Sequence, residues 1–433
     1  MKADTLAILR CPYCGGRLEL VESLFHRRDG DAIQDGVLGC QCCVFPIVDG
    51  IPVLHLQPSS TRAREQIAAG RPESARRTMF GLEDERQADA FDRLAASELA
   101  TYRDTVQALG PNFEGGYFLY RFSDPTFVVA EAVVTSVAAT VLGGSGRAID
   151  MCGGSGHLTR TLLDLSSAPP VLADLYFAKV WLARRFAAPG CEPVCCDGNA
   201  PLPFARGAFT FAMCADAFMY IWTKRQFVGE MERLVDARLT DAAASGPGAI
   251  VIAHTHNQNV WSPSHGQTLT PEGYAALFET TDPRLFGEAG LFADLGGGGP
   301  VDADLHETRA LDLSRRDPTS VLDRDPALTI IASRHPGVFK RHRIDATPPA
   351  RARGEFRLNP LYSAEPDGPS VSLRLRFPDR DYEEEYGACR QYLPAEVSVD
   401  AALLDALPTA VLPPGLVELA RRRVILDLPV RYY

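Results

Sequence analysis

The amino-acid sequence predicts an α/β protein: a doubly wound parallel sheet, with a small cysteine-rich module before it and a β-rich extension after it. Three observations support this. Closely spaced cysteines fill part of residues 1–57, short apolar runs alternate with helix-like segments over residues 147–254, and strand-like runs such as 370–377 follow near the C-terminus. The 433 residues exceed one ordinary domain. We expect four segments: 1–57, 58–145 (linker and helical cap), 146–340 (the main α/β domain) and 341–433 (the extension).

Two cysteine pairs in residues 1–57 predict a zinc site. Cys11 and Cys14 form one C-x-x-C knuckle, and Cys40 and Cys43 form the second, with Cys42 between them. Zinc prefers four tetrahedral ligands, and thiolates in tight turns suit it well. The spacing therefore favours Cys11, Cys14, Cys40 and Cys43 as zinc ligands, and leaves Cys42 as a bystander packed beside the site.

The sequences around these knuckles carry a family resemblance. Residues 6–12 read LAILRCP, and residues 45–54 read FPIVDGIPVL. Over about residues 3–56 the chain resembles the small zinc-ribbon activator of tRNA, rRNA and release-factor methyltransferases. The resemblance implies a zinc ribbon that stabilises or activates a methyltransferase, here within the same chain.

Residues 147–254 read as successive strands with polar residues where each strand ends. The first strand, 147–151, leads into the glycine-rich turn 152–156, and the second, 171–174, ends in Asp174. The third, 193–197, ends in Asp197, and a fourth covers 208–214. A nucleoside binds across the carboxyl ends of such strands, where glycine permits close approach. The glycine turn alone would fit a dinucleotide equally well.

The whole series resembles the class I S-adenosylmethionine-dependent methyltransferases, with a Rossmann-like sheet. The resemblance implies that Gly154 and Gly156 cradle the methionine half of S-adenosylmethionine. It also implies that Asp174 holds the ribose, that Asp197 meets the adenine amino group, and that Asp150 orders the loop. The remaining residues that we assign to this cofactor site are their neighbours Cys152, Gly153, Leu175, Gly198 and Cys214. Two positions depart from the family pattern: Cys152 replaces a glycine, and Thr210 replaces an acidic residue.

The fifth strand points to the chemistry. Residues 249–253 are apolar and are followed by His254-Thr255-His256. Histidine titrates near neutral pH, so His254 or His256 can act as a general base, with Asp216 after the fourth strand as a further catalytic candidate. Two alternatives stay open: structural histidines, and a second metal site formed with His265. The aromatic segment 117–122 fits either an acceptor pocket or plain core packing.

Composition narrows the function classes. The net charge of −11 argues against nucleic acid as a partner, and the arginines of residues 58–77 fit a solvated linker. No run of 18 apolar residues predicts a membrane span, and the N-terminus lacks the apolar core of a signal peptide, so we expect a cytoplasmic protein.

A small-molecule methyltransferase, acting on a sugar or secondary metabolite at O, N or C, is the leading interpretation. An RNA or protein methyltransferase is the second, and a non-catalytic scaffold, suggested by Cys152, is the third. Residues 345–433 carry no motif; they suit either a wall of the substrate pocket or a homodimer interface.

Overall fold

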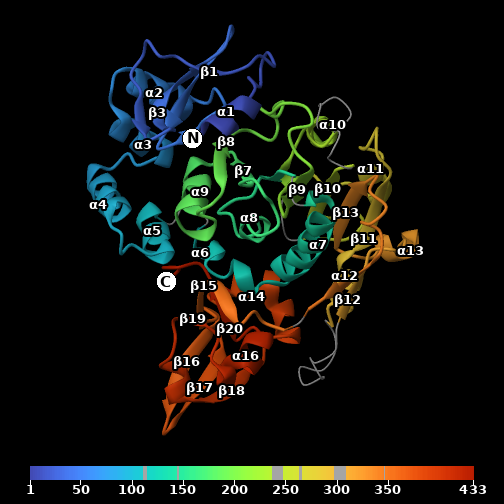
Figure 1. Ribbon diagram of the computed structural model, residues 1–433. Helices are drawn as coiled ribbons and strands as arrows, with labels where there is room; N and C mark the ends of the chain where they lie inside the picture. The colour runs from blue at the N-terminus through green and yellow to red at the C-terminus, as the bar shows by residue number, and fades with distance from the viewer. Residues whose placement is uncertain (111–114, 144–145, 237–246, 263–265, 297–308, 346) are drawn as a thin grey trace. The chain divides into compact units, whose positions relative to one another are not determined.

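The computed structural model describes the chain except for residues 111–114, 144–145, 237–246, 263–265, 297–308 and 346 (Figure 1). It comprises two compact units. The first contains Met1–Ala100, Val134–Gly287 and Arg316–Val338; the second contains Thr101–Val133, Glu288–Arg315 and Phe339–Tyr433. Each unit is therefore built from three separate segments of the chain. A division of the sequence into consecutive segments does not predict such an arrangement. Our division into four segments stays a prediction.

The first unit contains a seven-stranded sheet in the order β11-β13-β10-β9-β6-β7-β8. Its strands are β6 (Ala148–Met151), β7 (Val171–Asp174), β8 (Glu192–Cys195), β9 (Phe211–Ala215), β10 (Ala249–His256), β11 (Pro283–Gly287) and β13 (Ala327–Ser333). The run from β8 to β10 is parallel, whereas β13 is antiparallel to both β10 and β11. This mixed sheet confirms the predicted α/β fold.

The strand order brings the polar strand ends to one place. From β6 the chain steps outward to β7 and β8, and then returns to the other side of β6 to form β9 and β10. The order therefore reverses beside β6, and in open α/β sheets this reversal opens a crevice at the carboxyl ends of the strands. The connecting helices are α8 (Thr159–Leu162), α9 (Phe177–Leu182) with the π-turn η2 (Ala183–Ala187), η3 (Phe218–Tyr220), α10 (Lys224–Leu234), α11 (Pro271–Ala275) and α13 (Thr319–Leu322). Figure 1 shows α9 against β7 and β8.

The N-terminal module continues the sheet at the β8 edge. It consists of α1 (Ala3–Ile8) and the strands β1 (Glu19–Leu20), β2 (Arg27–Asp29), β3 (Ala32–Gly39), β4 (Val44–Val48) and β5 (Ile51–Pro52). Directly after β5, Val53 forms a parallel bridge with Cys195, and the Leu54 amide donates to the Cys195 carbonyl at 2.7 Å. Phe45 and Ile47 of the module share one apolar core with the sheet. The module is therefore an integral edge of the sheet.

Residues 58–77, which we expected to form a linker, are helical instead. Helix α2 (Pro58–Ala68) and helix α3 (Pro72–Phe80) pack on each other, and α4 (Glu85–Ala96) follows. Each of the first two helices begins with proline in its first turn, where the missing N–H costs nothing, so these prolines start helices rather than break them. Arg76 and Arg77 form ion pairs with Asp92 at 2.7 and 2.6 Å. These arginines are therefore neutralised within the protein.

The second unit is rich in β-structure near the C-terminus. Its strands form the pair β12 (Arg309–Asp312) and β14 (Arg341–Ile344), the sheet of β15 (Arg351–Leu358), β19 (Thr409–Val411) and β20 (Ile425–Leu428), and the sheet of β16 (Tyr362–Asp367), β17 (Ser370–Leu375) and β18 (Glu396–Asp400). Its short helices are α5 (Tyr102–Leu109), α6 (Gly115–Phe118), η1 (Arg121–Ser123), α12 (Glu288–Asp294), α14 (Arg380–Tyr386), η5 (Gly387–Gln391), α15 (Ala401–Leu404), η6 (Pro414–Leu416) and α16 (Val417–Arg421). The ring of Tyr117 packs against Tyr386 (centroids 5.2 Å apart), and that of Tyr120 packs against Tyr382 (5.5 Å). For the aromatic segment 117–122, the structure thus favours core packing.

Helix α7 (Pro125–Leu142) is the one described helix that is long and apolar enough to cross a membrane. However, 61% of this stretch is buried inside the protein. A helix in the core of a protein can be just as long and apolar, and it is buried in the same way. The length and composition of α7 are therefore not evidence of a membrane span.

A buried histidine joins the N-terminal module to the sheet and generates a pH prediction. His55 Nε2 lies 3.5 Å from Cys195 Sγ. Burial lowers the pKa of His55 to about 4, against a smaller opposing effect of Asp197. In the unfolded chain the imidazole titrates near 6.5, so between these two values only the unfolded state binds the proton.

We therefore expect the wild-type protein to lose stability relative to His55→Gln as the pH falls from about 6.5 to about 4, by roughly 3 kcal/mol in total. The depressed pKa implies no further change above pH 6.5. Urea unfolding of both proteins across this range measures the difference. Parallel pH profiles would show that His55 is not buried in its neutral form.

Candidate functional site

The glycine-rich turn after β6 adopts a backbone that restricts side chains. Gly154 and Gly156 have φ of 55° and 81°, in the left-handed region that favours glycine. A Cβ on Gly156 would lie 2.7 Å from the Cβ of Ala183, and one on Gly153 would lie 2.5 Å from an Asp150 oxygen. The glycines therefore allow the turn to pack directly against Ala183, in η2 after α9, and against the carboxylate of Asp150.

Asp150 is that carboxylate, at the end of β6. It is buried, and Thr159 Oγ1 donates a hydrogen bond to it at 2.6 Å. Burial, with a contribution from nearby Asp174, raises the pKa of Asp150 to about 7, although the Thr159 hydrogen bond opposes the shift. The structure thus places Asp150 under the turn, where it can order the loop.

Asp174 ends the neighbouring strand, β7, and connects to the turn. Its carboxylate accepts hydrogen bonds from the Gly154 amide at 3.0 Å and from the Tyr176 amide at 2.9 Å. Burial raises the pKa of Asp174, whereas Lys179 and these amides counteract the rise. The carboxylate is held in one orientation at the strand ends. Its neighbour Leu175 offers its carbonyl to the thiol of Cys195 at 3.1 Å.

Residues after β8 and on β9 gather around Cys152. Asp197 accepts a hydrogen bond from the Asn199 amide at 2.8 Å, and a Cβ on Gly198 would lie 3.4 Å from Cys152 Sγ. On β9, contact with the Cys152 thiol, together with burial, raises the pKa of Cys214 well above its usual value. Cys152 has φ of 59°, so it keeps the left-handed backbone that a glycine would adopt there, and its amide bonds to the Ala173 carbonyl at 2.7 Å.

The ends of β9 and β10 bring together a carboxylate and two imidazoles. One side-chain donor atom from each of Asp216, His254 and His256 lies within 4.8 Å of the other two. His254 Nε2 is 4.0 Å from Asp216 Oδ1, and the two imidazole centroids are 5.3 Å apart. His256 Nδ1 lies 3.0 Å from the Ser262 hydroxyl. The three candidate catalytic residues thus form one cluster; His265, from the alternative metal site, lies outside the described residues.

Four exposed aromatic side chains follow the strand ends, and sequence reasoning assigned no cofactor or catalytic role to three of them. Tyr176 follows β7, Tyr220 and Trp222 follow β9, and Trp261 follows β10, with 51–83% of each residue exposed. The Trp222 amide donates to Asn199 Oδ1 at 2.6 Å, which ties the β9 loop to the β8 loop. Exposed aromatic rings suit contact with a planar or apolar ligand.

In the N-terminal module, four thiols converge, but not the four that we expected. Sulfur–sulfur distances are 3.6 Å for Cys11–Cys42, 3.7 Å for Cys14–Cys40 and 3.6 Å for Cys40–Cys42, and the donors of all four residues lie within 4.8 Å of one another. Cys42 therefore takes the place that the C-x-x-C spacing gave to Cys43. Residues 40–43 form a tight turn, in which the Cys40 amide bonds to the Cys43 carbonyl at 3.0 Å and the Cys43 amide donates to Cys40 Sγ at 3.4 Å. The Cys43 thiol adjoins the cluster, 3.4 Å from Cys42 Sγ.

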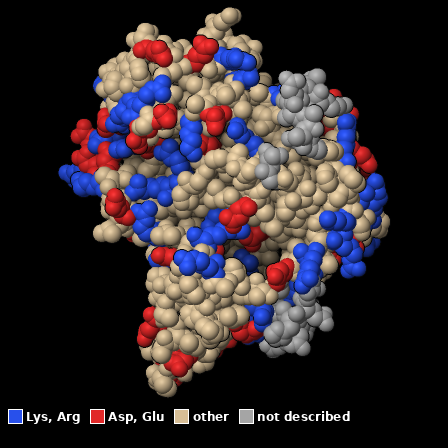
Figure 2. Space-filling view, viewed as in Figure 1, with Lys and Arg blue, Asp and Glu red and all other residues tan. Residues whose placement is uncertain are grey.

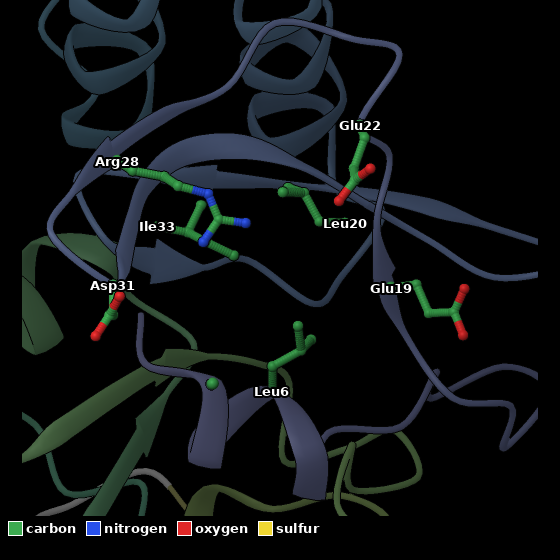
Figure 3. Close-up of a pocket in the computed structure, with 8 residues that line it drawn as sticks. Leu6, Glu19, Leu20, Glu22, Arg28, Asp31 and Ile33 are labelled. Carbon is green, nitrogen blue, oxygen red and sulfur yellow. The ribbon is translucent and has the colours of Figure 1, made fainter.

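The set of thiols fits a tetrahedral metal ion. Four zinc–sulfur bonds of about 2.3 Å would place neighbouring sulfurs about 3.8 Å apart, close to the spacings in the cluster. Cys11 is buried, whereas Cys14 and Cys42 are exposed, so the cluster lies at the surface of the module. A separate hollow of about 510 Å³ on this module is lined by the side chains in Figure 3, including Leu6, Glu22 and Arg28. No strand-end residue of the main sheet lines it, so it is not the crevice.

Comparison with known proteins yields distant structural likenesses only. No family model matches the chain, and no curated protein matches its sequence. Among solved structures, a complex of the Trm112 methyltransferase activator with a methyltransferase of Haloferax volcanii is 14% identical, with 48% of this chain and 92% of that chain covered and a TM-score of 0.33.

An S-adenosylmethionine-dependent methyltransferase from Mesorhizobium loti is also 14% identical (48% and 98% covered, TM-score 0.33). The 1,6-didemethyltoxoflavin-N1-methyltransferase of Burkholderia thailandensis is 13% identical (57% and 89% covered, TM-score 0.31). With identities and TM-scores this low, these likenesses establish no activity for the chain.

Proposed function

We propose that the protein is an S-adenosylmethionine-dependent methyltransferase that acts on a small molecule. The observation that carries this proposal is the buried Asp174 carboxylate, which accepts the Gly154 amide and so joins the glycine turn to the second strand. A fixed carboxylate beside a glycine turn can accept both hydroxyls of a ribose. Asp197, held by the Asn199 amide at the end of the next strand, is in sequence order to meet the adenine amino group.

The turn suits a nucleoside sulfonium better than a dinucleotide. A pyrophosphate needs a glycine turn that opens directly into a helix N-terminus, whose amides and dipole bind it. Here the helix after the turn, α8, begins only at Thr159 and has four residues.

The acceptor side lies at the ends of β9 and β10. S-adenosylmethionine supplies an electrophilic methyl group, and the protein must align an acceptor with it and remove the acceptor's proton if there is one. Asp216, His254 and His256 are the polar cluster at this edge. They are suited to hold an acceptor oxygen or nitrogen and to receive its proton.

Charge and exposed rings favour a small acceptor over RNA. An RNA enzyme needs a broad basic surface, but Figure 2 shows Lys and Arg interspersed with Asp and Glu over the face in view. Arg76 and Arg77 are paired with Asp92. The exposed rings of Trp222 and Trp261, on loops after β9 and β10, suit a planar or apolar acceptor.

The third interpretation, a non-catalytic scaffold, rests on Cys152. This residue keeps the backbone that the turn requires, at a cost of about 1–2 kcal/mol for a non-glycine residue in the left-handed region. Its amide remains bonded to Ala173, so the turn itself is intact. Cysteine in place of glycine at position 152 thus adds a side chain but leaves the turn in place. An intact turn favours a protein that still binds the cofactor.

We also propose that Cys11, Cys14, Cys40 and Cys42 bind one zinc ion, which stabilises the module that pairs with β8. A module this short has little core of its own, so the energy of metal binding contributes to its folding. Because Val53 and Leu54 pair with Cys195, the module supports the strand that leads to Asp197.

The cofactor proposal predicts that Asp174→Ala weakens binding of S-adenosylhomocysteine by about 1–3 kcal/mol, because two buried ribose hydroxyls lose a charged acceptor. Calorimetry measures the affinity, and thermal unfolding verifies that the variant folds. The control is Asp164→Ala, an equal loss of charge at an exposed position after α8. Equal affinity of both folded variants for the ligand would refute the ribose assignment.

The zinc proposal makes a prediction that separates neighbouring cysteines. Cys42→Ser should remove a ligand, lower the zinc content below one per chain and reduce the melting temperature. Cys43→Ser should keep the zinc, because its thiol lies outside the four. Elemental analysis and thermal unfolding of both variants decide the matter. Full zinc in Cys42→Ser with loss in Cys43→Ser would restore the C-x-x-C assignment.

A further inference from the structure

The cluster of Asp216, His254 and His256 rests on unusual backbone geometry. Asp216 and His254 both have φ of 51°, in the left-handed region that costs a non-glycine residue about 1–2 kcal/mol. The two strained residues are adjacent in space, since the Asp216 amide donates to the Ala253 carbonyl at 2.9 Å. Strain of this kind persists where the surroundings impose it, commonly at functional sites.

A β-bulge explains how the two imidazoles approach each other. The register of β10 against β13 shifts between Ile252 and Thr255, so an extra residue is inserted at His254. Alternate residues of a regular strand are about 6.6 Å apart, whereas the rings of His254 and His256 are 5.3 Å apart and nearly perpendicular, at 80°. The bulge thus re-aims His254 toward His256 and Asp216.

The spacing of the three groups is wider than that of a hydrogen-bonded catalytic dyad. A histidine that donates to its orienting carboxylate lies about 2.6–3.2 Å from it, whereas His254 Nε2 and Asp216 Oδ1 are 4.0 Å apart. Donor atoms that share one metal ion, with bonds of about 2.1 Å, lie about 3.0–3.4 Å apart. Donors separated by no more than 4.8 Å reach that arrangement with side-chain shifts of about 1 Å.

The surroundings complete the description of a metal site. The Ser262 hydroxyl lies 3.0 Å from His256 Nδ1, a contact that can fix the orientation of the ring and leaves Nε2 as the ligand atom. The side chains of His254 and Asp216 are 20% and 18% exposed, so solvent reaches one side of the cluster. Two imidazoles and one carboxylate with open positions form the ligand set that binds divalent first-row transition ions.

We propose that Asp216, His254 and His256 bind one divalent transition-metal ion, separate from the zinc of the N-terminal cysteines. Its role in methyl transfer rests on the proposed function: at the ends of β9 and β10 the ion would hold an acceptor oxygen and lower its pKa, so that the acceptor loses its proton to solvent rather than to either histidine. The resulting oxyanion would then attack the methyl group, so that the O–CH₃ bond forms as the S–CH₃ bond breaks and S-adenosylhomocysteine leaves. This narrows the acceptor to a group with a metal-binding oxygen, such as a phenol or enol.

The test titrates the zinc-loaded full-length protein with Co²⁺ in the absence of S-adenosylmethionine. We expect one Co²⁺ per chain beyond the zinc, with visible d–d absorption and no thiolate charge-transfer band. His254→Ala and Asp216→Ala should each weaken Co²⁺ binding by at least ~100-fold. Ser262→Ala removes no ligand, so it should weaken binding by only about tenfold and serves if a ligand variant fails to fold.

His26→Ala, which removes an exposed histidine of the N-terminal module, is the matched control and should bind Co²⁺ like wild type. No second equivalent of Co²⁺, or unchanged affinity in His254→Ala, Asp216→Ala and Ser262→Ala, overturns the metal site. Binding of S-adenosylhomocysteine is measured separately. If that ligand binds and Co²⁺ does not, the metal site fails alone; if Co²⁺ binds and that ligand does not, the methyltransferase proposal fails alone.

Discussion

The buried carboxylate of Asp150 is the interaction on which the glycine turn of the proposed cofactor site is built. It sits at the end of β6, accepts a hydrogen bond from Thr159 at 2.6 Å and fills the space that a side chain at Gly153 would need. The turn 152–156 folds over it, and the Gly154 amide then reaches Asp174 on the next strand. The carboxylate under the turn and the hydrogen bond to Asp174 thus fix the turn from two neighbouring strands.

A second constraint acts at the other side of β7. An edge strand exposes unpaired amides and carbonyls, and here the chain covers the β8 edge with its own N-terminal module through Val53 and Leu54. Aromatic packing reinforces the junction, since Phe80 of α3 lies 5.3 Å from both Phe177 and Trp181 of α9. The module therefore supports β8, the strand that precedes Asp197.

Sequence patterns predicted the parallel sheet well because each strand is an apolar run that ends in a polar residue. Strand β7 has the predicted bounds, 171–174, and its last residue, Asp174, accepts a hydrogen bond from Gly154 in the turn after β6. The helices within residues 58–77 were missed because proline and glycine are common in linkers and also start and end helices. Proline starts both helices, and glycine ends α3 with a left-handed φ of 70° at Gly81.

Other features of the site depend on geometry that one sequence does not reveal. Cys42 joins the other three thiols at a tight turn after Cys40, and His254 approaches Asp216 at a bulge with two left-handed residues. The discontinuous second unit likewise depends on long-range packing, such as that of Tyr117 on Tyr386. Spacing rules describe neighbours along the chain, and these contacts arise only when distant segments meet.

The most direct measurement is a crystal structure of the protein with S-adenosylhomocysteine. The account predicts the ribose hydroxyls within hydrogen-bond distance of Asp174, the adenine beside Asp197, and the sulfur facing the cluster of Asp216, His254 and His256. A ligand bound with its ribose away from Asp174, or with its sulfur pointing away from the ends of β9 and β10, would contradict it.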